Sequence, residues 1–149
     1  MNSIKRSGVG GVALQITKDA RTSGLVDETQ DGDTTHRAEV RVYAFNDLLL
    51  VVDLDKVSDE HIAALVARGA TQTNSIHQAV DARVMHSGNG YCVQLPPADD
   101  AGFSVGDPAG SHPAPGLIVI SKGKGPGADQ AARLASDLVD ERRAQVGDL

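Results

Sequence analysis

The chain has 149 residues, which is enough for one compact domain with its own core and too few for two large ones. Its strongly apolar runs, such as residues 48–52 and 117–120, fall far short of the roughly 20 residues of a membrane-spanning helix, so such a helix is excluded. The single cysteine, Cys92, excludes an internal disulfide.

The N-terminus and the charge balance bear on location. Lys5 and Arg6 are followed by glycines and not by an apolar stretch, which argues against a secretory signal and favours a cytoplasmic protein. The formal net charge of −6 comes mainly from aspartate, which greatly outnumbers glutamate. Such short carboxylates suggest a halophilic source, and a GC-rich genome is the alternative explanation.

The first half, residues 1–55, is expected to contain two short strands at residues 4–8 and 12–17, joined by a glycine bend. A short helix is expected at residues 18–23, followed by a turn at Gly32-Asp33. Residues 39–45 alternate between apolar and polar, residues 48–52 are apolar throughout, and Asn46-Asp47 lies between them, so the half is expected to end in a hairpin.

Residues 56–82 are expected to form a helical connector. Ser58 is a typical N-cap, acidic residues fill the first turn after it, and Gly69 is the expected end of the helix. A second short helix is expected at residues 74–81.

The second half, residues 83–122, repeats the order of the first. The corresponding segments are residues 84–88 with 4–8, 91–96 with 12–17, Gly106-Asp107 with Gly32-Asp33, and 117–121 with 48–54. The arm at residues 108–116 carries three prolines, which cannot donate to a strand ladder, so it is expected to be an irregular edge.

Residues 123–149 are expected to form a glycine-rich joint and an amphipathic helix from about Asp129 to Gln145. Its apolar stripe consists of Ala131, Leu134, Ala135 and Leu138. The stripe is expected to pack either on the strands of the same chain or on a second copy, which would form a homodimer.

The second half contains the motifs G-N-G-Y-C-V-Q-L-P at residues 88–96 and G-F-S-V-G-D at residues 102–107. Through these motifs it resembles the AbrB/MazE/SpoVT family of swapped-hairpin domains. Family members have a basic strand, a G-N-S-like bend, an apolar strand ending in Leu-Pro or Ile-Pro, a short helix and a G-(L/F)-x-x-G-D turn. The first half departs from this pattern, because Thr17 replaces the proline and the segment from Gly24 to Asp33 is longer than usual.

The resemblance implies an α+β, β-rich fold in which two ββαββ-like repeats interleave into one pseudo-dimeric swapped-hairpin barrel, with helices between the repeats and at the C-terminus. Exposed sheet edges in each repeat would be covered by the other repeat. A double-psi barrel, which is also built from two interleaved units, is the alternative topology.

The resemblance also implies binding of double-stranded DNA, as a transcriptional regulator or an antitoxin, through basic residues on the first strand and at the start of the short helix. The first repeat has Lys5, Arg6, Lys18 and Arg21 at these positions, and they are the predicted DNA-binding residues. The matching positions of the second repeat are His86, Pro97, Asp99 and Asp100, so that half is not expected to contact phosphate.

A solvated tail is the simpler interpretation of Lys5 and Arg6, and Arg21 could pair locally with Asp19 or Asp27. The competing function is a non-catalytic protein-interaction module that binds a partner such as a toxin. An enzyme is a third hypothesis that rests on fold analogy alone, and the chain is not predicted to be one.

No catalytic residue, metal site or cofactor is predicted. The five histidines lack ligand spacing, and residues 123–127 lack the phosphate-loop pattern. The neighbours Ser87 and His86, like Ser111 and His112, would point to opposite faces of a strand.

Overall fold

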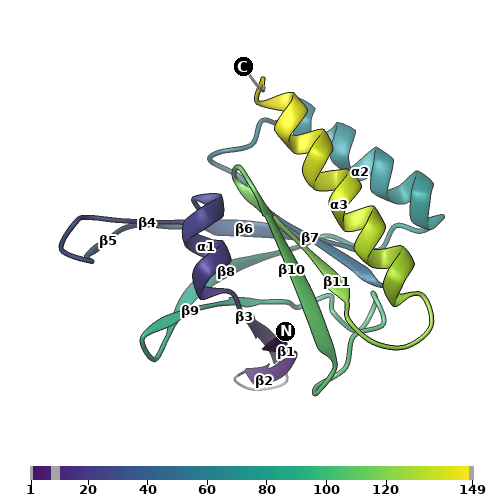
Figure 1. Cartoon of the computed structure of the whole chain (residues 1–149), viewed down its shortest axis with the longest axis horizontal. Coiled ribbons are helices and arrows are strands. Elements are labelled where there is room, and N and C mark those ends of the chain that lie inside the picture. The colour runs from purple at the N-terminus through teal and green to yellow at the C-terminus, as the bar shows by residue number, and fades with distance from the viewer. Residues whose placement is uncertain (1, 8–10, 148–149) are drawn as a thin grey trace.

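The computed structural model describes residues 2–7 and 11–147, so the predicted glycine bend at residues 8–10 lies outside the described residues. The fold is α+β and strand-rich, with a nearly closed, barrel-like antiparallel sheet and three helices in the described part (Figure 1). The elements are β1 (Asn2–Ser3), β2 (Lys5–Ser7), β3 (Gly11–Gln15), α1 (Thr17–Ser23), β4 (Val26–Glu28), β5 (Thr34–Arg37), β6 (Glu39–Phe45), β7 (Leu48–Asp53), α2 (Asp59–Thr73), β8 (Val80–Ser87), β9 (Gly90–Gln94), β10 (Pro108–Ala114), β11 (Leu117–Lys122) and α3 (Ala128–Gln145).

The main sheet has the strand order β1-β10-β11-β7-β6-β8-β9-β3-β2, and every pairing is antiparallel. Its two outer strands, β1 and β2, are separated along the chain by Ile4 alone. The Ile4 N–H donates to the carbonyl of Asp107 at 2.8 Å, and its carbonyl accepts from Gly106 N–H at 2.8 Å. The sheet therefore returns almost to its own start, which leaves few free edges.

The two halves lie side by side through matching registers. In the β3–β9 ladder Leu14 is opposite Val93, and the bonds Ile16 N–H to Tyr91 carbonyl (2.9 Å) and Leu95 N–H to Val12 carbonyl (3.0 Å) flank that pair. When residues 12–17 are aligned with residues 91–96, each of these two hydrogen bonds corresponds to the other.

The second ladder behaves in the same way. The β6–β7 and β10–β11 hairpins each have a two-residue turn, at residues 46–47 and 115–116, and they meet through the β7–β11 ladder. When the two turns are aligned, Leu50 corresponds to Val119, and these two residues are opposite each other in the β7–β11 ladder.

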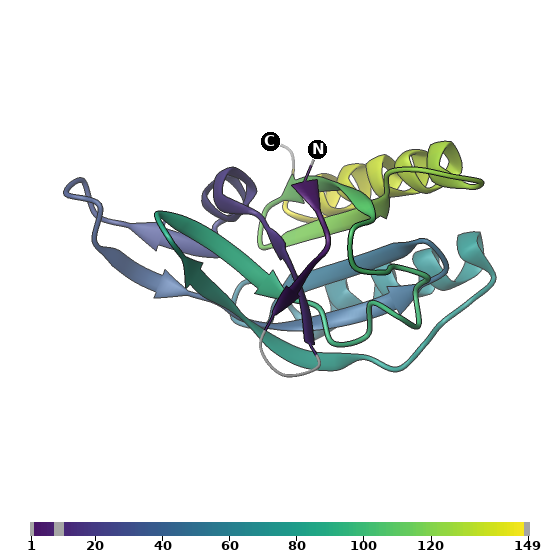
Figure 2. The same cartoon turned by 90° about the horizontal axis from the view of Figure 1, so that it is seen from below.

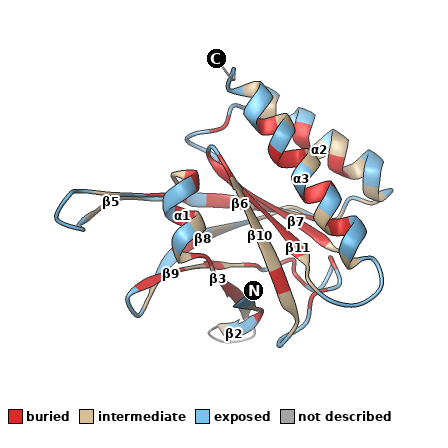
Figure 3. Cartoon of the chain, viewed as in Figure 1, coloured by how far each residue is buried: buried red, intermediate tan, exposed pale blue. Residues whose placement is uncertain are grey.

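The core has two parts, because the apolar residues of the sheet face both ways (Figure 3). One part fills the barrel and includes Leu14, Val93 and Val42. The other lies between the outer face of the sheet and helices α2 and α3, and it includes Phe45 and Leu50. Strand β7 is covered on both faces, which explains its unbroken apolar sequence.

The two-stranded β4–β5 sheet, here called the ribbon, projects away from α2 and α3 (Figures 1 and 2). The predicted turn at Gly32-Asp33 lies in the loop at its tip, so its match to Gly106-Asp107 is wrong. The Ala38 carbonyl accepts from Val84 N–H at 3.1 Å, just as the Asp107 carbonyl accepts from Ile4. In the expected repeat, residue 38 would correspond to residue 107, and the ribbon has no equivalent strand pair in residues 83–122.

Helix α2 begins as predicted, with the Ser58 hydroxyl accepting from His61 N–H at 3.2 Å. The predicted end at Gly69 is wrong, because the helix runs on to Thr73 and ends at Asn74, which has a left-handed φ of 51°. The predicted helix at residues 74–81 is also wrong, since β8 begins at Val80 and pairs with β6.

Two further predictions fail in the second half. Residues 97–102 form turns and not a helix, and the proline-rich arm is the regular strand β10, paired with β11 from Ala109 to Ala114. Pro113 precedes the Ala114–Leu117 pair that closes the hairpin. Backbone N–H groups point alternately toward and away from the partner strand, and at position 113 the N–H would point away from β11, so a proline is tolerated there.

Helix α3 is confirmed, and its predicted stripe is buried. The helix contacts β10, β11 and α2 of the same chain, so the stripe is covered without a second copy, and it is not the surface for the expected homodimer. No described helix combines the length and apolar character needed to cross a membrane.

Candidate nucleic-acid interface

The four predicted DNA-binding residues are all exposed, but the fold divides them into two pairs. Lys5 and Arg6 lie on β2, opposite Ala13 and Val12 of β3. Lys18 and Arg21 lie on α1, which follows the other end of β3. The ladder from residue 12 to residue 16 separates the two pairs by about 13 Å.

Arg21 is already engaged within the molecule. Its guanidinium donates to the Glu28 carboxylate on the ribbon and lies 5.6 Å from the centre of the Tyr91 ring. This hydrogen bond raises the pKa of Arg21 and lowers the pKa of Glu28 from their ordinary values. The partners expected from sequence, Asp19 and Asp27, instead contact Ser111 and Lys56.

Tyr91 joins the ribbon to the barrel. Its ring is 3% exposed, and its hydroxyl accepts from the Thr34 hydroxyl at 2.7 Å and donates to Glu28 at 3.2 Å. The ring also packs against His86, with 4.9 Å between ring centres. The ribbon and the β8–β9 hairpin, which are distant in sequence, therefore meet at the Tyr91 side chain.

Tyr91→Phe is expected to loosen the ribbon, because the Thr34 and Glu28 side chains lose a shared partner. We expect a loss of about 1 kcal/mol in the free energy of unfolding and faster amide hydrogen exchange in β4 and β5. Tyr43→Phe, six residues beyond the end of the ribbon at Arg37, is the matched control. Unchanged exchange in the Tyr91 variant would show that the ribbon is held in another way.

The outward-facing side of β2, β3, β8 and β9 is here called the polar platform. Strand alternation turns Leu14 and Val93 into the core and the platform residues outward. The platform residues are Lys5, Gln15, Arg83, Met85, Cys92 and Gln94. None of these six is acidic, although the chain as a whole has a net charge of −6.

One row of the platform crosses all four strands. Lys5 is opposite Ala13, and Ala13 is opposite Gln94. Arg83 precedes the Val84–Val93 pair and Gln94 follows it, so Arg83 is opposite Gln94. The row therefore has a cation at each end.

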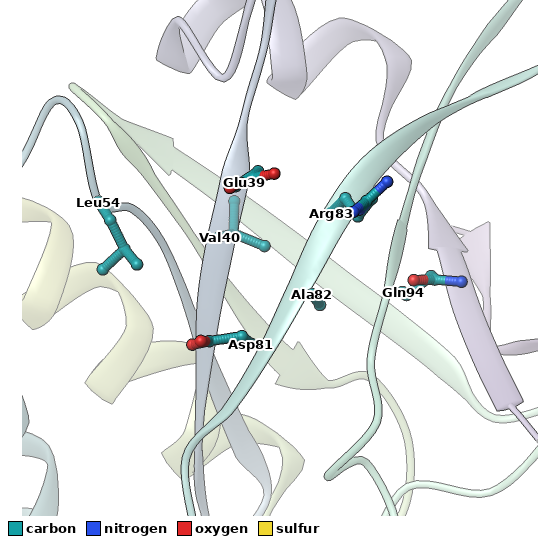
Figure 4. Close-up of a pocket in the computed structure, with 7 residues that line it drawn as sticks. All are labelled: Glu39, Val40, Leu54, Asp81, Ala82, Arg83 and Gln94. Carbon is teal, nitrogen blue, oxygen red and sulfur yellow. The ribbon is translucent and has the colours of Figure 1, made fainter.

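A cavity of about 290 Å³ borders the platform at Arg83 (Figure 4). Arg83 lies between Gln94 and Glu39, its partner residue on β6, as the figure shows. Two residues along these strands, Arg41 and Asp81 form an ion pair at 2.8 Å, which raises the pKa of Arg41. These carboxylates limit the positive region on its β6 side.

Sequence reasoning missed Arg83, because it lies one residue outside the matched segments 84–88 and 4–8. A usable signal was present: counting back from the turn at Ser87 and Gly90 places Arg83 opposite Gln94.

The neighbouring side chains of Ser111 and His112 contact different partners. His112 contacts the hydroxyl of Ser121 at 3.0 Å, but Ser121 is 2% exposed, and Ser111 donates to Asp19. Burial lowers the pKa of His112. Among residues 2–7 and 11–147, no group of three His, Cys, Asp or Glu side chains could hold a metal ion.

Comparison with known proteins finds no family model, no curated protein and no solved structure that matches this chain.

Proposed function

We propose that this chain is a non-catalytic DNA-binding regulator or antitoxin-like protein of swapped-hairpin type, and that its polar platform contacts the duplex. The architecture is supported by the two ladders in which each half pairs with its own counterpart, β3 with β9 and β7 with β11. Under the same alignment of the two halves, the Asn2–Ala109 pair corresponds to the Ala82–Val40 pair.

The observation that carries the proposal is the row from Lys5 to Arg83. Its end strands are three strand spacings apart, or about 14 Å. The major groove of B-DNA is about 12 Å wide, so the two cations can reach phosphates on either side of it.

Between these cations the platform presents amide side chains. Gln15 and Gln94 occupy matched positions on β3 and β9, on diagonally related residues about 7–8 Å apart. A glutamine amide can pair with the major-groove edge of adenine. The surface thus combines groups that neutralise phosphate with groups that can distinguish bases.

The test is fluorescence anisotropy of labelled duplexes, including the gene's own upstream region, across a salt series. Lys5→Gln and Arg83→Gln are each expected to weaken binding about tenfold and to reduce the slope of log affinity against log salt by about 1. Arg133→Gln, which removes an exposed charge on α3, is the matched control. Wild-type affinity and slope in both platform variants would refute the proposal.

A protein-interaction module remains the second candidate, because Glu28 occupies the guanidinium of Arg21 and so competes with phosphate there. Residues 97–102 also bring exposed Asp99 and Asp100 to the position that α1 has in the first half. A stoichiometric polypeptide that co-purifies without nucleic acid would select this function.

A further inference from the structure

A second surface, apart from the row between Lys5 and Arg83, has the chemistry of an anion site. A cavity of about 380 Å³ lies between the ribbon and the β8–β9 hairpin, and its size is within the usual range for small-ligand sites. The lining residues are Thr34, Thr35, His36, Arg37 and His86. Each has an N–H or O–H group, and none is a carboxylate.

The internal contacts show which of these groups remain available. The Thr34 hydroxyl bonds Tyr91, and the Thr35 hydroxyl donates to the Asp27 carbonyl at 3.1 Å. Within the described part of the chain, the Arg37 guanidinium and the His86 ring have no hydrogen-bonded side-chain partner. Both are exposed residues, so a ligand can reach them.

His36 is held in place from behind. Its Nε2 lies 2.9 Å from a carboxylate oxygen of Asp53, which is fully buried, so that the other ring nitrogen is left for a ligand. An anion in the cavity would accept a hydrogen bond from that second nitrogen when it carries a proton. Asp53 is therefore a positioning residue for this histidine.

The carboxylates next to the cavity are compensated by cations. Glu28 pairs with Arg21 and accepts from Tyr91, and Asp27 pairs with Lys56 at 2.7 Å. An anion that enters the cavity therefore meets the histidines and Arg37, while the negative charges of Glu28 and Asp27 are balanced by their cationic partners.

We propose that this cavity binds a phosphate group, with Arg37, His86 and His36 as its ligands. A planar guanidinium matches phosphate oxygens through parallel hydrogen bonds. The phosphate could belong to a small phosphate ester or to a nucleic-acid backbone, and the site does not depend on the DNA-binding proposal.

The test is an NMR titration of the full chain with inorganic phosphate, following the imidazole signals of His36 and His86, with potassium chloride of matched ionic strength as the reference. We expect saturable shifts in the millimolar range. Arg37→Gln and His86→Gln should each weaken binding about tenfold or more, Arg37→Lys should weaken it less, and Arg133→Gln should leave it unchanged.

Shifts with both inorganic phosphate and a short DNA duplex that fail to saturate or that equal those in chloride, or wild-type binding by Arg37→Gln, would overturn the proposal. A parallel titration with a short DNA duplex separates the sources: saturation by both probes supports a general phosphate site, and saturation by the duplex alone assigns the phosphate to a nucleic-acid backbone. Amide spectra of the variants show whether the fold is retained. Loss of phosphate binding with intact duplex binding would leave the platform proposal standing.

Discussion

Replacing Arg142 by alanine is expected to lower the free energy of unfolding by about 3 kcal/mol. Arg142 is 3% exposed, and its guanidinium donates to the Pro115 carbonyl at 2.7 Å, to His61 Nδ1 at 3.0 Å and to the Lys56 carbonyl at 3.3 Å. These contacts join the end of α3 to the β10–β11 turn and to the start of α2. Alanine would leave these three acceptors without their donor and would remove the packing of a buried side chain.

The measurement is urea denaturation followed by circular dichroism. The neighbouring Arg143 is exposed and is the matched control, since Arg143→Ala is expected to change the free energy of unfolding by less than about 0.5 kcal/mol. Equal effects of the two substitutions would mean that the Arg142 contacts contribute little net stability.

Phe45→Ala is expected to cost about 4 kcal/mol, because it empties a fully buried position between the sheet and the helices. The ring lies under Gly69 of α2, where an added Cβ would come within 3.0 Å of Phe45 Cζ. Gly69→Ala alone is therefore expected to destabilise the fold by about 1 kcal/mol or more through overpacking.

The pair provides its own control in a double-mutant cycle. With the Phe45 ring removed, the alanine at position 69 meets space, and the double variant should lose less stability than the sum of the single ones. Strict additivity, measured by denaturant unfolding, would contradict the close packing of α2 on β6.

Local patterns were sufficient for the elements with their own start and stop signals. The β6–β7 hairpin has clear alternation and a two-residue turn, and Ser58 and the stripe of α3 identify two helices. Gly69 misled because a glycine required for close packing is indistinguishable in sequence from a helix terminator. The prediction for residues 74–81 was wrong because residues 75–79 form an irregular connection, and Val80 and Asp81 already belong to β8, which pairs with β6.

The candidate site was only partly predictable for a related reason. Lys5 could be identified from its strand, but its neighbours on the surface come from β9 and β8 of the other half, and only the register reveals them. The sequence prediction treated the first half as one unit and therefore placed Arg21 in the same site as Lys5. The observed pairing instead places Arg21 beside Tyr91, on the opposite end of the β3–β9 ladder.

The ribbon has a consequence for any symmetric ligand. It occurs in the first half alone, so the two ends of the barrel differ in shape and charge even though their strands correspond. In the proposed DNA complex, the two arms of a palindromic duplex on the platform would face different ends of the barrel, only one of which carries the ribbon. A complex with a single chain would therefore be asymmetric.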